Sequence, residues 1–158
     1  IEIKDIVPPA DLTSHIRQAV VIAGASRIGH GVSIRSERDA QQLMKVMRDR
    51  GVTVEVALTS NQQILDVTAR NSQFPVYGRA GVPRVLATDD PGVERTDLSA
   101  QYAKAFAWFD LDYQDLKTLS YASVDASFLN PFKRAHLKQD LDVAFAAFEK
   151  KWATSAAS

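Results

Sequence analysis

Three short apolar segments, each followed by polar residues, constrain the fold of this chain more than any other feature. They span residues 26–31, 52–58 and 84–87. Segments in which apolar residues recur at helical spacing lie before the first of these three, between the first two and beyond the last. Strands that alternate with helices are typical of parallel βα units. The sequence therefore predicts an α/β fold built around a parallel sheet.

Helices are expected where apolar residues recur every three or four positions. The expected helical ranges are 12–23, 36–51, 98–109, 113–121 and 131–152, the last as a long amphipathic helix capped by Asn130. Several aromatic residues also recur at helical spacing and are expected in the core rather than at a stacking surface. These residues are Phe106, Trp108, Phe109, Phe145 and Phe148.

Composition and charge exclude several classes of function. The 158 residues are 46% hydrophobic and 24% charged, which suits one packed domain. Nineteen Lys and Arg residues balance nineteen Asp and Glu residues, so no net charge favours nucleic acid or an anionic membrane surface. Cysteine is absent, which excludes disulfides and cysteine-ligated metals. No apolar run approaches the roughly 20 residues that span a bilayer, and the first residues lack a signal-peptide layout, so we expect no membrane partner and a cytoplasmic protein by default.

Polar residues with useful chemistry follow each predicted strand. His30 lies at the end of the first, residues 59–61 follow the second, and Asp89 and Asp90 follow the third. Because the carboxyl ends of parallel strands meet at one edge, these side chains are expected to lie close together. An imidazole and two carboxylates in one mouth can bind a divalent metal or hold and deprotonate a water.

Simpler interpretations of the same residues stay open. Taken singly, a histidine between glycines is more often structural, and the Asp89-Asp90 pair before Pro91 is more often a turn or a helix cap. Zinc hydrolases usually need three protein ligands. His15 and His136 fall on predicted helices, so neither is expected to join His30 in a metal site.

Three motifs in a fixed order resemble one known family. Residues 27–32 (RIGHGV), 54–61 (VEVALTSN) and 86–93 (LATDDPGV) are together similar to the carboxyl-terminal half of the adenosine deaminase family of metal-dependent hydrolases. The resemblance runs from about Val7 to about Lys133. It implies a partial (β/α)8 TIM barrel, with strands six to eight, their helices and the carboxyl-terminal helices in this chain. Residues 1–158 would then be the carboxyl-terminal portion of a single barrel domain.

The resemblance also implies roles for individual residues. Asp89 matches the aspartate that ligates a single zinc ion, and His30 the histidine that orients and deprotonates the zinc-bound water. Asp90 matches the carboxylate that positions this water and hydrogen-bonds the purine ring. Ser60 is expected to support a zinc ligand rather than to bind zinc. The implied reaction is hydrolytic deamination of adenosine to inosine and ammonia.

Other parts of the family pattern are missing from the sequence. The His-x-His motif of the first strand and the His-Ala-Gly-Glu motif of the fifth have no counterpart in these 158 residues. A complete barrel takes about 250 residues, and three strands alone leave two open sheet edges. We therefore expect the amino-terminal half of the same enzyme as a partner, either as a separate chain or as a missing segment. The isolated chain is expected to be inactive.

Besides an adenosine deaminase, which is the first possibility, the sequence leaves two others open. Phe74-Pro75 stands where the family commonly has His-Pro, and Gln101-Tyr102 where it has Glu-Tyr. Such departures leave the substrate open, so the second possibility is a deaminase of another aminopurine, such as adenine or an adenine nucleotide. The third is a non-catalytic half-barrel interaction module that retains His30 and the Asp89-Asp90 pair as relics or turns.

Overall fold

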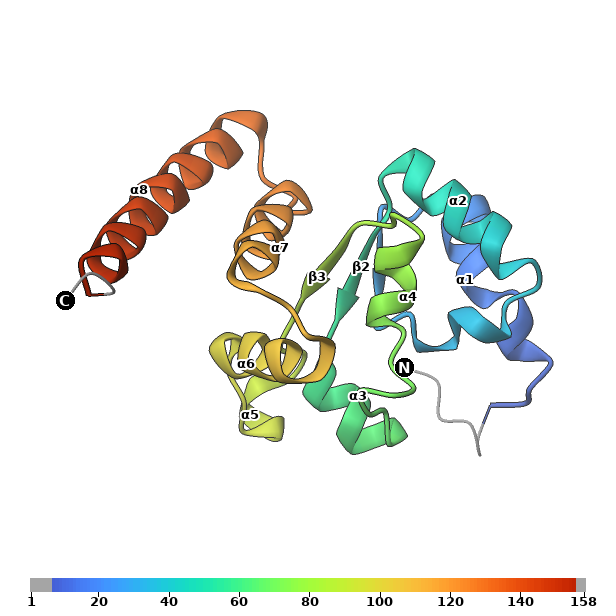
Figure 1. Cartoon of the computed structure of the whole chain (residues 1–158). Helices are drawn as coiled ribbons and strands as arrows, with labels where there is room; N and C mark the ends of the chain where they lie inside the picture. Colours follow the sequence, from blue (N-terminus) through green and yellow to red (C-terminus); the bar gives the residue numbers. More distant parts are fainter. Residues whose placement is uncertain (1–6, 156–158) are drawn as a thin grey trace.

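A three-stranded parallel sheet lies at the centre of the molecule (Figure 1). The computed structural model describes residues 7–155. The strands β1 (Arg27–Gly29), β2 (Thr53–Val56) and β3 (Arg84–Leu86) lie side by side in chain order. Helices between the strands return the chain to the same end of the sheet, as parallel pairing requires. The predicted α/β fold with a parallel sheet is confirmed.

Helical segments precede, connect and follow the strands (Figure 1). The strands are preceded and connected by η1 (Asp11–Thr13), α1 (His15–Arg17), η2 (Gln18–Ile22), η3 (Val32–Ser36), α2 (Ala40–Arg50), α3 (Leu58–Leu65) and α4 (Phe74–Arg79). They are followed by α5 (Pro91–Glu94), α6 (Leu98–Phe109), α7 (Tyr113–Asp125) and α8 (Pro131–Ser155). The sequence did not predict α3, α4 or α5.

The helix expected over residues 12–23 is broken into three pieces. A 3-10 turn, one α turn and a π turn succeed one another, and Ser14 departs from helical geometry at φ −150°. The backbone N–H of Ile16 donates to Glu37 Oε1 at 2.6 Å instead of to a carbonyl of its own helix. This long-range cap replaces the hydrogen bond that a continuous helix would make.

The core lies between the sheet and the helices that cover it. Val54 and Val56 of β2 are fully buried and pack in one cluster with Leu43 and Met47 of α2. Phe74 of α4 is also fully buried, and its ring stacks on an aromatic ring of α6 with 4.8 Å between centroids. Burying a side chain of this size stabilises the fold by about 1.5–3 kcal/mol.

The aromatic residues expected in the core divide into two groups. Trp108 and Phe109 are partly buried and pack against the core, as predicted. Phe106 and Phe148 are 54% and 47% exposed, so the core prediction is wrong for them. Phe145 is half-buried and contacts two tyrosine rings of α7 rather than the sheet.

The last helix, α8, extends away from the sheet and packs on α7 (Figure 1). The expected cap is confirmed, because Asn130 Oδ1 accepts from the backbone of the first turn at 2.9 Å. Polar pairs join the two helices, including Lys117 with Glu149 at 2.7 Å. Phe132 and Val143 are 83% and 72% exposed, so α8 does not bury one apolar face as an amphipathic helix would. No helix in the described part of the chain is long and apolar enough to cross a membrane.

Candidate active site

The carboxyl ends of the three strands bring the predicted site residues to one edge of the sheet. His30 comes directly after β1, and its backbone N–H donates to Glu55 O of β2 at 2.8 Å, which continues the ladder by one step. On the other side, Ala87 N donates to Val56 O at 3.1 Å, two residues before Asp89. The ladder therefore fixes where His30 and Asp89 leave the sheet.

Three of the four predicted residues meet at one carboxylate oxygen. Ser60 Oγ donates to Asp89 Oδ2 at 2.7 Å, and His30 Nε2 lies 3.4 Å from the same oxygen. Within residues 7–155 no hydrogen bond is made to Asp89 Oδ1. The side chains of His30 and Asp89 are 18% and 32% exposed, so small molecules can reach them. One oxygen of this carboxylate is thus oriented by protein groups and the other is available to a ligand.

The second strand end differs from the expected loop. Residues 59–61 form the first turn of α3, and all three are buried. The turn is stable because Gln101 Oε1 accepts from the backbone N–H groups of Leu58 and Thr59 at 2.9 and 3.2 Å. These donors have no partner within the helix, and the buried amide of Gln101 supplies one. Gln101, one of the departures from the pattern that the resemblance implies, therefore caps α3 in this chain.

Asn61 is a site residue for which no individual role was predicted from the sequence. Its Oδ1 lies 2.9 Å from His30 Nδ1, and its side chain is fully buried. Asn61 follows Ser60, so consecutive residues of one helical turn contact His30 and Asp89. The signal in the sequence was its position directly after Ser60 at a predicted strand end.

The backbone of both His30 and Asp89 is left-handed. Their φ angles are +58° and +59°, whereas the other four non-glycine residues with positive φ in the described part of the chain lie at helix ends. Side chains favour this conformation only weakly, so neighbouring groups must hold it. At β1, Gln73 Nε2 donates to His30 O at 2.6 Å and Tyr77 Oη donates to Gly31 O at 2.8 Å.

Asp90 stands apart from the other predicted residues. It occupies the position before α5, where its backbone carbonyl accepts from Glu94 N at 2.9 Å. Its carboxylate is exposed, caps no helix and makes no hydrogen bond to another described residue. The interpretation of Asp90 as a side-chain helix cap is therefore not supported, and its carboxylate is free to face solvent or a ligand.

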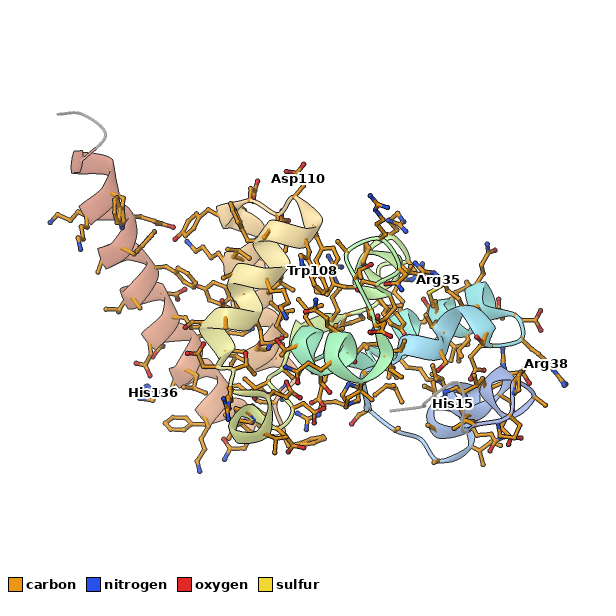
Figure 2. The ribbon with its side chains drawn as sticks, turned by 90° about the horizontal axis from the view of Figure 1, so that it is seen from below. His15, Arg35, Arg38, Trp108, Asp110 and His136 are labelled. Atoms are coloured by element: carbon orange, nitrogen blue, oxygen red, sulfur yellow. The ribbon has the colours of Figure 1, made fainter. Side chains whose placement is uncertain are left out.

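The other two histidines have acidic partners of their own. His15 of α1 is 3.5 Å from the buried Glu37 carboxylate, and His136 of α8 is 3.9 Å from Asp140. Figure 2 shows them towards opposite ends of the molecule. Among the described residues no group of three or more His, Cys, Asp or Glu side chains could hold a metal ion. The described residues therefore do not form a complete metal site by themselves.

Comparison with known proteins identifies the family. The family model for adenosine deaminase matches residues 10–144, which is most of the chain. The chain belongs to the adenosine deaminase family. An adenosine deaminase of Enterococcus faecalis is 30% identical over 126 residues, covering 79% of this chain and 36% of that protein. An aminodeoxyfutalosine deaminase of Streptomyces coelicolor is 35% identical over 132 residues, covering 83% of this chain and 33% of that protein.

The solved structures agree with this family fold. An amidohydrolase of Burkholderia ambifaria with bound zinc superposes with a TM-score of 0.76 at 20% identity, covering 88% of this chain and 38% of that one. At this identity the likeness shows the fold, and it confirms that the three strands and their helices form a partial TIM barrel. The chain spans about a third of the length of the curated relatives that it matches.

Proposed function

We propose that this chain carries part of the active site of an aminopurine deaminase that hydrolyses adenosine to inosine and ammonia. The observation that best supports the proposal is the contact of both Ser60 and His30 with Asp89 Oδ2 at the carboxyl edge of the sheet. Active sites of TIM-barrel enzymes are built at this edge. Membership of a family of hydrolytic deaminases gives the chemistry for which such residues are suited.

Asp89 fits the role of a zinc ligand. Its Oδ2 is held by Ser60, and its Oδ1 makes no hydrogen bond to a described residue, so one oxygen stays available to a cation. When bound, zinc would lower the pKa of a coordinated water to about 7. Zinc needs about three protein ligands in a catalytic site, so other residues must come from outside this chain.

His30 and Asp90 fit the handling of water and substrate. His30 Nε2 lies at the mouth beside Asp89, where it accepts a proton from the attacking water. The oxygen of that water adds to the purine carbon that bears the amine, and the bond from this carbon to the amine then breaks. The proton taken up by His30 passes to the leaving amine to give ammonia, and the second proton of the water ends on a ring nitrogen of inosine. Asp90 has an exposed carboxylate without another task, which can orient the water and accept a hydrogen bond from the purine ring.

The partner that completes the site is proposed to be a polypeptide with the remaining barrel strands. In residues 7–155, β1 and β3 each pair on one side only, which leaves two sheet edges for further strands. This polypeptide would supply the His-x-His and His-Ala-Gly-Glu motifs. Its loops would also help to select the substrate, and the relative that deaminates aminodeoxyfutalosine keeps a second aminopurine as the alternative to adenosine.

The test is zinc content and deamination in the complete protein, compared among three variants. We expect Asp89→Ala to lose zinc and turnover together, and His30→Ala to lose turnover while it keeps zinc. Asp110→Ala is the matched control, because Asp110 is also an aspartate with positive φ, at +51°, but lies at the end of α6. It should keep both properties. Unchanged zinc in Asp89→Ala would exclude Asp89 as a ligand.

The same measurements separate the alternatives. Turnover of a second aminopurine in preference to adenosine would correct the substrate and keep the site. A complete protein with neither zinc nor turnover would indicate a non-catalytic module, because one histidine and an aspartate pair do not retain zinc tightly.

A further inference from the structure

The imidazole of His30 is held at its two nitrogens by different groups. Nε2 faces Asp89 Oδ2 at 3.4 Å, at the mouth of the site, and Nδ1 faces Asn61 Oδ1 at 2.9 Å, inside the protein. A carbonyl oxygen only accepts hydrogen bonds, so the contact with Asn61 requires a hydrogen on Nδ1. In the neutral imidazole the lone pair is then on Nε2.

We infer that Asn61 is a positioning residue that sets the tautomer of His30, so that the basic nitrogen faces the reacting water. The inference rests on the proposed function. A reversed amide would donate to Nδ1 and move the hydrogen to Nε2, which would leave no base at the mouth. With the observed orientation, the protonated imidazole also keeps an acceptor at each end, Asn61 at Nδ1 and Asp89 at Nε2. One amide orientation therefore serves His30 before and after proton uptake.

The surroundings of Asn61 keep this contact in place. Its backbone N–H donates to Ala57 O at 3.0 Å, and its carbonyl accepts from Val67 N at 3.1 Å. His30 is fixed on the other side by the β2 ladder and by Gln73. The two side chains can separate only if a strand end or the first turn of α3 moves.

The amide nitrogen of Asn61 destabilises the fold, which supports a role for this residue in function. Its Nδ2 is buried and has no hydrogen-bond partner within the described structure. A buried donor without a partner loses its hydration with nothing in return, so an apolar side chain of similar size would suit the core better. The benefit of an amide at this position lies in the bond that its oxygen makes to His30.

The first test measures the tautomer directly. Nitrogen-15 NMR of the imidazole rings of the complete protein distinguishes a hydrogen on Nδ1 from one on Nε2, and the signals that disappear in His30→Ala assign His30. At a pH where His30 is neutral, we expect Nδ1–H in the unmodified protein. Asn61→Asp keeps an acceptor oxygen and should keep this tautomer, whereas Asn61→Leu should shift the population towards Nε2–H. Nε2–H in the unmodified protein would overturn the inference without the need for any variant.

The second test measures turnover in the complete protein. We expect Asn61→Leu to lower kcat by about 100-fold, which is the lower range for loss of a positioned base, with KM little changed. Asn61→Asp should recover most of that loss. Gln101→Leu is the matched control, because Gln101 is equally buried and caps the same helix without touching His30 or Asp89.

The outcomes separate the positioning role from the proposed function. Equal losses of kcat in Asn61→Leu and Gln101→Leu would show that Asn61 only stabilises α3, and would overturn the inference. Absence of turnover in the unmodified protein would instead refute the proposed deaminase, while the NMR result would still show whether Asn61 sets the tautomer.

Discussion

A single methyl group added at Gly31 should destabilise the protein through two separable effects. Gly31 has φ +59°, and a Cβ there would lie 2.5 Å from Tyr77 Oη and 3.1 Å from Val54 Cγ1. Tyr77 is fully buried and donates to the carbonyl of Gly31 itself at 2.8 Å. Gly31→Ala therefore strains the backbone and pushes away the hydroxyl that holds it.

The structure contains a matched control for the backbone effect. Gly24 has φ +70°, and a Cβ there would meet no atom within 4 Å. Gly24→Ala should cost only the left-handed strain of a residue with a Cβ, about 1–2 kcal/mol. Gly31→Ala should cost this amount plus about 1–3 kcal/mol for a buried hydroxyl that loses its partner. The expected total for Gly31→Ala is about 2–5 kcal/mol.

Urea unfolding followed by tryptophan fluorescence measures both free energies of unfolding. A third variant, Tyr77→Phe, removes the hydroxyl, so Gly31→Ala should cost less in that background than in the unmodified protein. Equal costs for Gly24→Ala and Gly31→Ala would refute the reasoning, because they would show that the contact with Tyr77 contributes nothing beyond backbone strain.

Three further predictions concern the site and the helices around it. Ser60→Ala removes the donor that orients Asp89, so the zinc affinity of the complete protein should fall about 10- to 100-fold in a competition assay with a chelator. Glu149 has a pKa held below its usual value by the hydrogen bond from Lys117, so its contribution to stability is present above about pH 4.5 and is lost as the pH falls through the lowered folded-state pKa. The difference in urea midpoint between Glu149→Gln and the unmodified protein should accordingly vanish in acid, and a pH-independent difference would contradict this. Asp112→Ala removes the capping-box hydrogen bond that Asp112 Oδ1 accepts from Asp115 N at 2.8 Å, so thermal unfolding should show a loss of about 1 kcal/mol. An unchanged transition would show that the cap does not stabilise α7.

The sheet and its functional edge could be predicted because their signals are local. Each strand is a short apolar run ended by polar residues, and the polar ends follow directly from the parallel arrangement. These signals predict His30 and Asp89 at one edge, where the structure has them. Ser60 donates to Asp89 at 2.7 Å, and its role beside a zinc ligand stays a prediction. The zinc, the partner and the cytoplasmic location stay predictions.

The parts that the sequence did not predict depend on distant residues. The first turn of α3 consists of polar residues that read as a loop, and it becomes a buried helix because Gln101, more than 40 positions later, caps it. The break in the expected helix over residues 12–23 depends on Glu37 in the same way. No role could be predicted for Asn61 because its contact with His30 joins the ends of two different strands, which are distant in the sequence. Short-range patterns contain none of these pairings.

The left-handed backbone at His30 and Asp89 affects which substitutions stabilise the protein. Glycine adopts this conformation without steric cost, whereas a residue with a Cβ is strained there by about 1–2 kcal/mol. His30→Gly and Asp89→Gly would relieve this strain but would also remove the contacts at Asp89 Oδ2. Selection for stability alone would therefore set relief of backbone strain against the loss of these contacts at two residues of the candidate active site.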